Sequence, residues 1–490
     1  MENAKQFLAD EQTLDPQDWD SMRRLGHQMI DDVMDYLQHI KEKPVWQKFP
    51  DESKQFLQQD VPAEPTDANG VYAEFKEHIF PYIKGNTHPR FWAWVQGTGT
   101  PLGVLADMLA SAMNPNVSMG DHAAVYVDKQ VVDWCKQIMH YPQTASGILV
   151  SGASMANITA LIVARNHQAA TARQQGVASA KGRMVMYCSA ETHACVIKAA
   201  EAIGIGTDGV RKIAVNEKYE IDIALLKDVI EKDHVDGNLP FCVVGNAGTV
   251  NTGAIDDLDA LRNICDDYKL WFHVDGAFGA FAKLAPAYEE RLKAIEVADS
   301  VALDLHKWMY MPYEVGCTLV KNAEAHRNAF NGAPNYLLHH ERGLAAGPDG
   351  IQNYGLELSR GFKALKVWMS IKEHGLEKYK ALIQQNIHQA FYVGELVTKE
   401  EQLELLTPVT MNIVCYRFTG NNIPAEKLNG INKEILMRLQ EQGIASPSST
   451  LLQGRYAIRL AIVNHRSRKE DFETLINETI RIGNEVKESL

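Results

Sequence analysis

Lys307 is the residue least expected in its surroundings, because it stands between a histidine and a tryptophan in the apolar segment ALDLHKWMYMPYEVG, residues 302–316. Apolar surroundings disfavour an ammonium ion and favour the neutral amine. A neutral lysine amine is a nucleophile that forms a Schiff base with an aldehyde. Lys307 is therefore either a surface lysine on a short apolar segment or a residue that holds an aldehyde cofactor. The segment alone favours the surface interpretation.

A second candidate feature is a turn that could bind phosphate. The apolar run ILV, residues 148–150, is followed by SGASMAN and then by a helical pattern. Gly152, Ala153 and Ser154 are small, so backbone N–H groups at a helix N-terminus could approach an anion closely. Helix capping by Ser151 or Ser154 is the simpler interpretation of this turn taken alone.

Three further polar residues follow apolar runs that are typical of buried strands: His193 after MVMY, Thr249 after PFCVVG, and Asp275 after FHV. In an open parallel sheet, ligands bind beyond the carboxyl ends of the strands, which is where these residues would meet. Taken singly, His193 is more often a residue at a helix start. Asp275 is flanked by apolar and small residues, which favours a buried carboxylate that pairs with a cation over a solvent-facing turn.

Together these features fit pyridoxal phosphate. The phosphate needs a helix N-terminus, the aldehyde needs a lysine, and the pyridine nitrogen needs a carboxylate to stay protonated. The ring face needs a stacking partner, which His193 could be. Lys307 stands 32 residues after Asp275. The phosphate-binding turn, the histidine, the threonine, the aspartate and the lysine follow one another in this order along the chain. The sequence therefore predicts pyridoxal phosphate as the cofactor.

The elements that must position these residues follow an α/β pattern. From about residue 90 to 320, short apolar runs alternate with helical stretches, which predicts a mostly parallel sheet covered on both faces. A long helix and then mixed strands and helices predict a small C-terminal α+β domain from about 380. Before the sheet, Asp15 and Pro16 open an amphipathic helix that ends at Pro44, and residues 51–70 have the composition of a linker. The apolar face of that helix must be buried on its own domain or on a partner subunit.

Composition excludes several classes of protein. A chain of 490 residues needs more than one core, and a net charge of −13 argues against nucleic-acid or anionic-membrane partners. No run approaches the roughly 18 apolar residues of a membrane span, and MENAKQFLAD has no apolar core of signal-peptide length. The seven cysteines are scattered without a CxxC pair, which predicts reduced thiols and no zinc site. We therefore expect a cytoplasmic protein without a metal.

The chain resembles the group II pyridoxal-phosphate decarboxylases, particularly the aromatic L-amino acid decarboxylases, over nearly its whole length. HVDGAF and LHKW in this spacing are the most specific motifs, and KPVW and HPRFWAWVQGTGTPLGVLADML also match. The resemblance implies the aspartate-aminotransferase type of PLP-dependent transferase fold (fold type I), as an obligate homodimer with the active site at the subunit interface. We expect an N-terminal helical dimerisation segment over 1–88, a large cofactor-binding α/β domain over 89–380 and a small α+β domain over 381–490.

The resemblance also implies a role for each candidate residue. Lys307 would carry the cofactor, His306 would lie beside its phosphate, and His193 would stack on the ring and help place the substrate. Asp275 would pair with the pyridine nitrogen, and Ala277 would pack on the ring. The other implied contacts are the phosphate with Ala153 and Ser154, the ring substituents with Thr249, and the substrate with Trp94, Val95 and Gly97.

Two positions depart from the family pattern, and one loop residue matches it. The family often has asparagine at Asp304 and a second arginine at Gly361. A carboxylate beside a phosphate is repulsive, so no phosphate contact is assigned to Asp304. In the family a loop tyrosine delivers or relays the proton to Cα, and Tyr336, 29 residues after Lys307, matches it. A related class with phenylalanine there makes aldehydes, so Tyr336 favours an amine product, although it could simply pack on its neighbours.

The expected reaction is decarboxylation of an L-amino acid, in first place an aromatic one, to the amine and CO2. Placing the substrate carboxylate in line with the ring's π-system selects the bond that breaks. Trp92 and Trp94 favour an aromatic or large apolar side chain, whereas Arg90 leaves glutamate or aspartate open. An aromatic aldehyde synthase is a further alternative. The complete set of parts disfavours a non-catalytic scaffold, and LHKW and the N-terminal helix disfavour an aminotransferase or another lyase.

Overall fold

A seven-stranded sheet forms the centre of the computed structural model, which describes residues 13–332, 340–421 and 423–488. The strand order is β1-β7-β6-β5-β4-β2-β3. Strands from β6 to β3 pair in parallel, and β7 runs antiparallel to both of its neighbours. The strands are β1 (Ser146–Val150), β2 (Met184–Ser189), β3 (Val210–Ile213), β4 (Leu239–Asn246), β5 (Trp271–Asp275), β6 (Ser300–Asp304) and β7 (Gly316–Val320).

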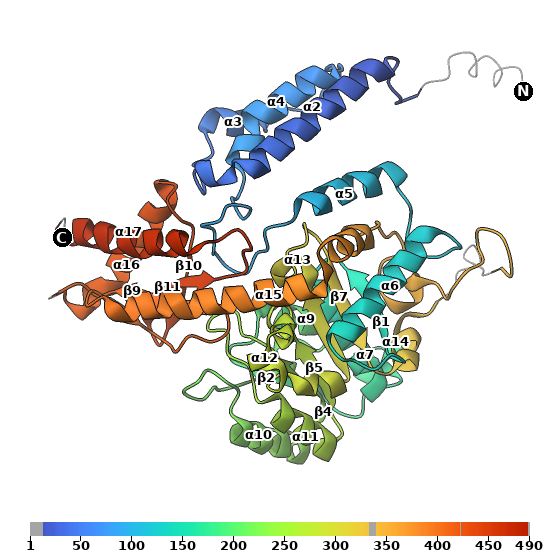
Figure 1. The fold of residues 1–490 in the computed structure, drawn as a ribbon. Coiled ribbons are helices and arrows are strands. Elements are labelled where there is room, and N and C mark those ends of the chain that lie inside the picture. Colours follow the sequence, from blue (N-terminus) through green and yellow to red (C-terminus); the bar gives the residue numbers. More distant parts are fainter. Residues whose placement is uncertain (1–12, 333–339, 422, 489–490) are drawn as a thin grey trace, which may run out of the picture.

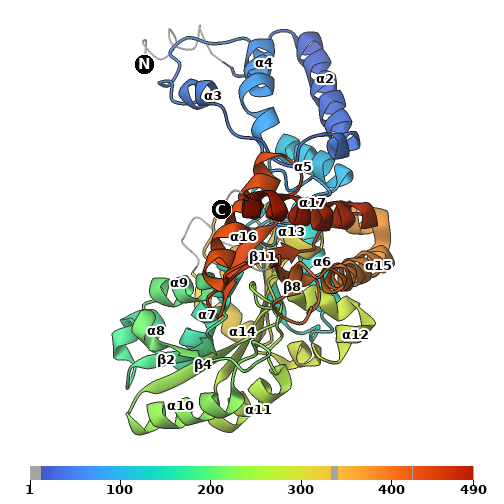
Figure 2. The same cartoon turned by 90° about the vertical axis from the view of Figure 1, so that its left-hand side faces the viewer.

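Helices cover both faces of this sheet (Figures 1 and 2). Successive strand side chains point to opposite faces, so Val185 and Tyr187 of β2 join one buried cluster and Met184 and Met186 join another. The helices of the first cluster are α6 (Ala123–Ile138), α10 (Ile223–Val235) and α11 (Leu258–Tyr268), and those of the second are α7 (Ala153–Gln168), α9 (Ala194–Ala202) and α14 (Ala323–Phe330). The mostly parallel α/β fold predicted from the sequence is confirmed.

A four-stranded antiparallel sheet lies at the C-terminal end of the chain, in the order β10-β11-β9-β8. Its strands are β8 (Leu403–Leu405), β9 (Ile413–Phe418), β10 (Ser448–Leu452) and β11 (Arg455–Ala461), packed with α16 (Ala425–Glu441) and α17 (Lys469–Glu488). The long helix α15 (Ala364–Lys399) connects it to the large sheet and bends at Gly375, where φ is 69°. The predicted domain boundary at 380/381 falls inside α15, and the division into domains stays a prediction.

The N-terminal helices α2 (Trp19–Gln38), α3 (Asp51–Phe56) and α4 (Ala68–His78) stand apart from the body in Figures 1 and 2. Asp18 caps α2, because its carboxylate accepts hydrogen bonds at 3.0 Å from the backbone N–H groups of Asp20 and Ser21. The predicted helix start at Asp15 is therefore wrong by three residues. The stretch predicted as a linker, residues 51–70, contains α3 and the first residues of α4.

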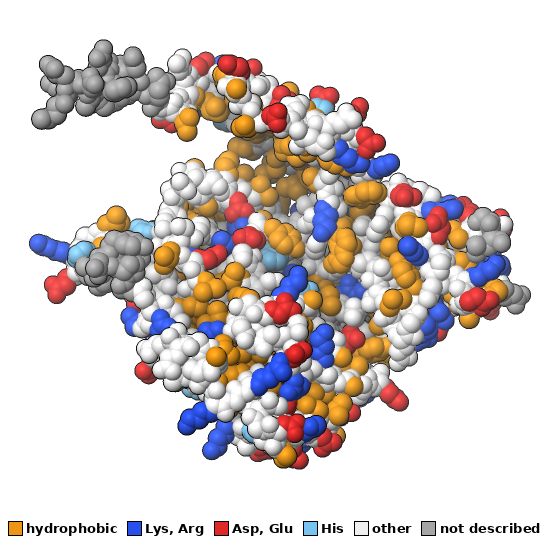
Figure 3. Space-filling model, turned by 180° about the vertical axis from the view of Figure 1, so that it is seen from behind, with side chains coloured by type: hydrophobic (Ala, Val, Ile, Leu, Met, Phe, Trp, Pro, Cys, Tyr) orange, Lys and Arg blue, Asp and Glu red, His pale blue; other side chains and the backbone are white. Residues whose placement is uncertain are grey.

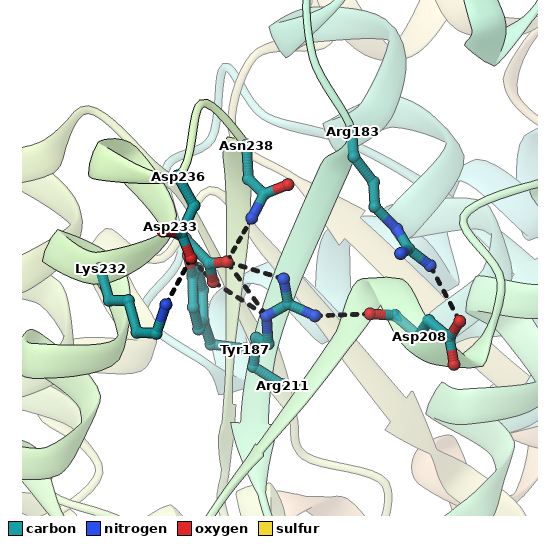
Figure 4. Close-up of polar contacts among 8 residues, drawn as sticks. All are labelled: Arg183, Tyr187, Asp208, Arg211, Lys232, Asp233, Asp236 and Asn238. Atoms are coloured by element: carbon teal, nitrogen blue, oxygen red, sulfur yellow. Dashed lines mark hydrogen bonds and ion pairs between the residues drawn. The ribbon is translucent and has the colours of Figure 1, made fainter.

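A buried polar cluster ties the edge strand β3 to β2 and α10 (Figure 4). Asp233 on α10 accepts hydrogen bonds from the Tyr187 hydroxyl at 3.0 Å, from Nε and Nη2 of Arg211, and from Asn238 Nδ2 at 2.7 Å. Burial alone would raise the pKa of Asp233, but the hydrogen bonds from Arg211 and Tyr187 outweigh it and hold the pKa below its usual value. The cluster thereby fixes a strand that has a hydrogen-bonded neighbour on one side only.

Candidate active site

A cavity of about 420 Å³ opens at the carboxyl ends of the central strands. Parallel strands present these ends at one edge of the sheet, so residues far apart in sequence meet there. The structure brings together around this cavity most of the predicted site residues: Trp94, Val95, Ala153, Ser154, His193, Thr249, Asp275, Ala277, His306 and Lys307.

One predicted residue is placed differently, and a second is not among the described residues. Gly97 is not among the residues that line this cavity, and a Cβ atom there would collide with the carbonyl oxygens of His306 and Lys307. Gly97 therefore lets its segment pack tightly against the lysine-bearing turn, and it lines a separate, smaller cavity. Tyr336 lies outside the described residues.

Lys307 lies on the short helix α13 (Leu305–Trp308), directly after β6. Its Nζ atom is 2.9 Å from Oδ2 of Asp304. Burial lowers the pKa of Lys307, but the attraction of Asp304 outweighs it and the pKa lies above the ordinary lysine value. The expectation that apolar surroundings favour the neutral amine is therefore wrong for this structure, because it left out the carboxylate three residues earlier.

Asp275 ends β5 and is 6% exposed. Its Oδ1 atom accepts a hydrogen bond from the backbone N–H of Ala277 at 3.1 Å, which fixes the carboxylate at the cavity wall. A buried carboxylate held in this way is suited to pair with a protonated ring nitrogen.

His193 is the N-cap of α9, and its Nδ1 atom accepts a hydrogen bond from the backbone N–H of Cys195 at 3.2 Å. Burial lowers the pKa of His193, although Asp275 acts in the opposite direction. With Nδ1 engaged as an acceptor, the ring face and Nε2 are left for a ligand.

The start of α7 has the properties of a phosphate cradle. No side chain of the described residues caps this helix, so the alternative of capping by Ser151 or Ser154 is wrong. A Cβ atom on Gly152 would lie 3.1 Å from Cε1 of His306 and 3.4 Å from Oδ1 of Asp304. His306 in turn accepts a hydrogen bond at Nδ1 from the Val315 N–H at 3.2 Å. The backbone N–H groups at the start of α7 and the ring of His306 therefore border the same part of the cavity.

The cavity mouth is formed by Trp94, which is 52% exposed and has a left-handed backbone with φ of 52°. Lys84 Nζ lies 4.3 Å from the centroid of the Trp94 ring. Trp92 is 1% exposed and stacks on Phe472 in the C-terminal core, so its predicted part in substrate selection is wrong. Arg90, which left acidic substrates open, is also absent from the residues that line the cavity.

Sequence reasoning missed several residues of the cavity wall. Asn246 ends β4 and donates hydrogen bonds from Nδ2 to Thr192 Oγ1 at 3.0 Å and to Asp256 Oδ2 at 2.8 Å. The rule that located Asp275, a polar residue directly after an apolar strand, also finds Asn246 in PFCVVGN. The other missed lining residues include Met155, Cys195, Phe278 and Asp304.

Comparison with known proteins agrees with this geometry. Residues 50–419 match the pyridoxal-dependent decarboxylase conserved domain. The aromatic-L-amino-acid decarboxylase of Bacillus atrophaeus is 33% identical over 471 residues, which cover 95% of this chain and 96% of that protein. A phenylacetaldehyde synthase of Arabidopsis thaliana is 27% identical over 92% of this chain and 93% of its own length.

Among solved structures, Oryza sativa TDC with PLP and tryptamine has the same fold, with a TM-score of 0.88, 23% identity and coverage of 97% of this chain and 100% of that one. The family match spans most of the sequence and includes every residue of the cavity wall. The chain belongs to the pyridoxal-dependent decarboxylase family.

Proposed function

We propose that this protein decarboxylates an aromatic L-amino acid to the corresponding amine and CO2, with pyridoxal phosphate as the cofactor. One observation carries the proposal: the Lys307 amine, the Asp275 carboxylate and the uncapped start of α7 face a single cavity.

The residues present fit the cofactor. The cavity volume, about 420 Å³, is within the range of small-molecule sites. Gly152 leaves the start of α7 open to an anion, because any larger residue there would press on His306. Lys307, Asp275 and His193 supply the amine, carboxylate and ring that the aldehyde, the pyridine nitrogen and the ring face require.

Pyridoxal phosphate, when bound, supplies an electron sink for the charge left at Cα after a bond breaks. The backbone at Ala153 and Ser154 would hold the phosphate, and Asp275 would keep a proton on the ring nitrogen. His193 would lie against the ring, where it orients the substrate carboxylate. Lys307 would hold the aldehyde and release it to the substrate amine.

The choice of product depends on where a proton is delivered after CO2 leaves. We assign this delivery to Tyr336, the residue that matches the loop tyrosine of the family. With dissolved O2 as the oxidant, a Tyr336→Phe variant is expected to release aldehyde, ammonia and hydrogen peroxide in place of part of the amine. Unchanged release of amine alone, at an unchanged rate, contradicts this assignment.

An aromatic substrate is supported by the cavity wall and by the relatives. Trp94, Val95 and Phe278 supply apolar and aromatic surface beside the polar groups. The curated relatives include decarboxylases named for tryptophan, tyrosine and aromatic L-amino acids. Arg90 does not line the cavity, so it is not available to bind the side-chain carboxylate of glutamate or aspartate.

The experiment that tests the function uses purified protein with added pyridoxal phosphate and a panel of L-amino acids. The panel contains tryptophan, tyrosine, phenylalanine, dihydroxyphenylalanine, histidine, glutamate and aspartate, and products are identified by mass spectrometry. Amines from the aromatic members are expected. Amine from glutamate or aspartate alone overturns the substrate class, and the absence of any amine overturns the reaction.

We further propose a homodimer with the active site at the subunit interface. Apolar side chains on α2 and on α5 (Pro101–Met113) are exposed, among them Trp19 at 59%, Met29 at 39% and Met113 at 57%. Figure 3 shows hydrophobic side chains gathered in the recess beneath the N-terminal helices. An unpartnered apolar surface of this kind is typical of a protein interface.

A cytoplasmic location is also part of the proposal. All seven cysteines are free and buried, as expected in a reducing compartment. Within the described ranges, no helix has the length and hydropathy to cross a membrane. The described residues contain no group of three or more His, Cys, Asp or Glu side chains that could hold a metal ion.

A further inference from the structure

Asp304 is a buried carboxylate at the centre of the site, to which the proposed function gives no role. It is the last residue of β6 and is 2% exposed. Its Oδ2 atom lies 2.9 Å from Lys307 Nζ and 3.6 Å from His306 Nε2. Its Oδ1 atom is buried and has no hydrogen-bond partner among the described residues.

A buried carboxylate is costly unless a cation compensates it, and Lys307 is the nearest cation. The same contact fixes the charge of the lysine. An ammonium ion loses solvation in this cavity, but a carboxylate at hydrogen-bond distance stabilises it more than burial destabilises it. The 2.9 Å contact with Asp304 therefore favours the ammonium form of Lys307.

The other titratable groups around Lys307 do not replace this contact. Asp275 faces it from the end of β5 and also favours the ammonium form, but makes no ion pair with it. Cys195 faces it from α9, and burial raises the pKa of that thiol to about 12, so it is neutral near pH 7. His193 and His306 have pKa values lowered by burial. Tyr313, whose ring lies 4.2 Å from that of His306, has a pKa raised by burial and is neutral as well.

We propose that Asp304 is a positioning residue that holds Lys307 as an ammonium ion in the cofactor-free protein, so that cofactor uptake is slow at neutral pH and speeds up as the pH rises. The inference rests on the proposed function, in which Lys307 holds the aldehyde. Only the neutral amine attacks an aldehyde, and each pH unit by which the lysine pKa exceeds the pH reduces the free amine about tenfold.

Cofactor uptake begins with the loss of one proton from the Lys307 ammonium group. One N–H bond of the ammonium breaks, its electron pair stays on Nζ, and the proton passes by way of Asp304 Oδ2 to solvent. Nζ then bonds to the aldehyde carbon, and the carbonyl oxygen leaves with the two remaining hydrogens as water. Asp304 is then without its cation beside the start of α7, where its Oδ1 lies 3.4 Å from the position of a Gly152 Cβ.

The test measures Lys307 itself, in cofactor-free protein and without substrate. Wild type and Asp304→Asn are labelled with traces of acetic anhydride between pH 6 and 12, and the Lys307 peptide is quantified by mass spectrometry. Labelling at pH 7 is expected to be about tenfold faster in the variant, for a pKa that falls by one unit. Equal or slower labelling of Lys307 in a folded variant overturns the proposal.

A matched control is Asp107→Asn, which removes the partner of Lys366 at the same Nζ–Oδ2 distance, 2.9 Å. This variant is expected to leave the labelling of Lys307 unchanged. If Asp304→Asn does not fold, the wild-type profile alone decides: its Lys307 inflection must lie at a higher pH than that of an exposed lysine such as Lys227. An inflection at or below that of Lys227 overturns the proposal.

Borohydride trapping separates this inference from the proposed function. After brief exposure to pyridoxal phosphate at pH 7, both proteins are reduced and the modified lysine is mapped. More rapid modification of Lys307 in Asp304→Asn supports the inference, and equal rates at Lys307 overturn it while the proposed function stands. Modification of some other lysine in both proteins overturns the proposed function and the inference together.

Discussion

At the scale of single residues, Asp275 and Lys307 perform different tasks. In the proposed function Lys307 would hold the cofactor, whereas the Asp275 carboxylate would keep a proton on the ring nitrogen. Asp275→Asn is expected to retain cofactor on Lys307 but to lose about 100-fold or more in kcat, the scale of removing one electrostatic partner from an active site. Steady-state rates and the cofactor's absorption band measure the two effects separately. Full activity with asparagine at this position contradicts the assigned role.

Trp94 is a second residue with a separable effect, because its half-exposed ring lines the cavity. Trp94→Ala is expected to raise KM for an aromatic substrate up to about tenfold, since an aromatic contact contributes about 0.5–1.5 kcal/mol. Trp94→Phe should restore most of the loss. Lys84→Met serves as the control, because it removes the cation over the ring and leaves the ring in place. An unchanged KM in Trp94→Ala places substrate binding elsewhere in the cavity.

The residues that sequence reasoning placed well are those whose position follows from strand ends. Asp275, His193 and Ser154 each follow an apolar run, and a parallel sheet brings such residues together. The charge on Lys307 could not be predicted in this way, because it depends on where the Asp304 carboxylate points. Trp92 was misassigned for a related reason: it lies two residues before Trp94, but its ring turns into the C-terminal core and stacks on Phe472.

At the scale of elements, the Asp233 cluster is expected to stabilise the β3 edge of the sheet. Asp233→Asn leaves Arg211 partly buried without its partner and should lower the free energy of unfolding by about 3 kcal/mol. The folded-state pKa of Asp233 is depressed below 3.8, so its contribution is present at pH 5–7 and is lost as the pH falls through that lowered value. Urea unfolding of the wild type and of Asp233→Asn measures the difference in free energy of unfolding at pH 7. The same difference is expected to be smaller at pH 3.

Asp236→Asn is the matched control for that prediction. Asp236 is three residues further along the chain and pairs with exposed Lys232 on the surface, also drawn in Figure 4. Surface pairs contribute about 0–1 kcal/mol, so this variant should unfold almost as the wild type does. If Asp236→Asn lowers the free energy of unfolding as much as Asp233→Asn does, the buried cluster has no special role in stability.

Most elements could be predicted from hydrophobic patterning, and the exceptions have identifiable causes. The strands β2, β4, β5 and β6 are apolar runs between helical stretches, as buried parallel strands must be. The strand β7 was missed, because it runs antiparallel to β6 and only the four-residue helix α13 separates the two strands along the chain. The start of α2 was misplaced because two aspartates precede the helix and only Asp18 caps it.

At the scale of the whole molecule, the exposed face of α5 is expected to be part of the dimer interface. Met108 is 46% exposed on this helix, so Met108→Glu would place a charge in the interface and shift the protein to monomers. Sedimentation velocity measures the shift. Val235→Glu, on an exposed residue of α10, should leave the assembly unchanged. A wild-type protein that sediments as a monomer at micromolar concentration contradicts the proposed homodimer.

The cavity wall is formed by residues between Trp94 and Lys307, which lie at strand ends, in turns and at helix starts that come together only in the folded chain. Pyridoxal phosphate can therefore bind the folded chain and has no comparable site on the unfolded one. Each tenfold excess of free cofactor over its Kd then adds about 1.4 kcal/mol to the stability of the fold. In a cell, vitamin supply would accordingly set how long the protein survives proteolysis, as well as how much of it is active.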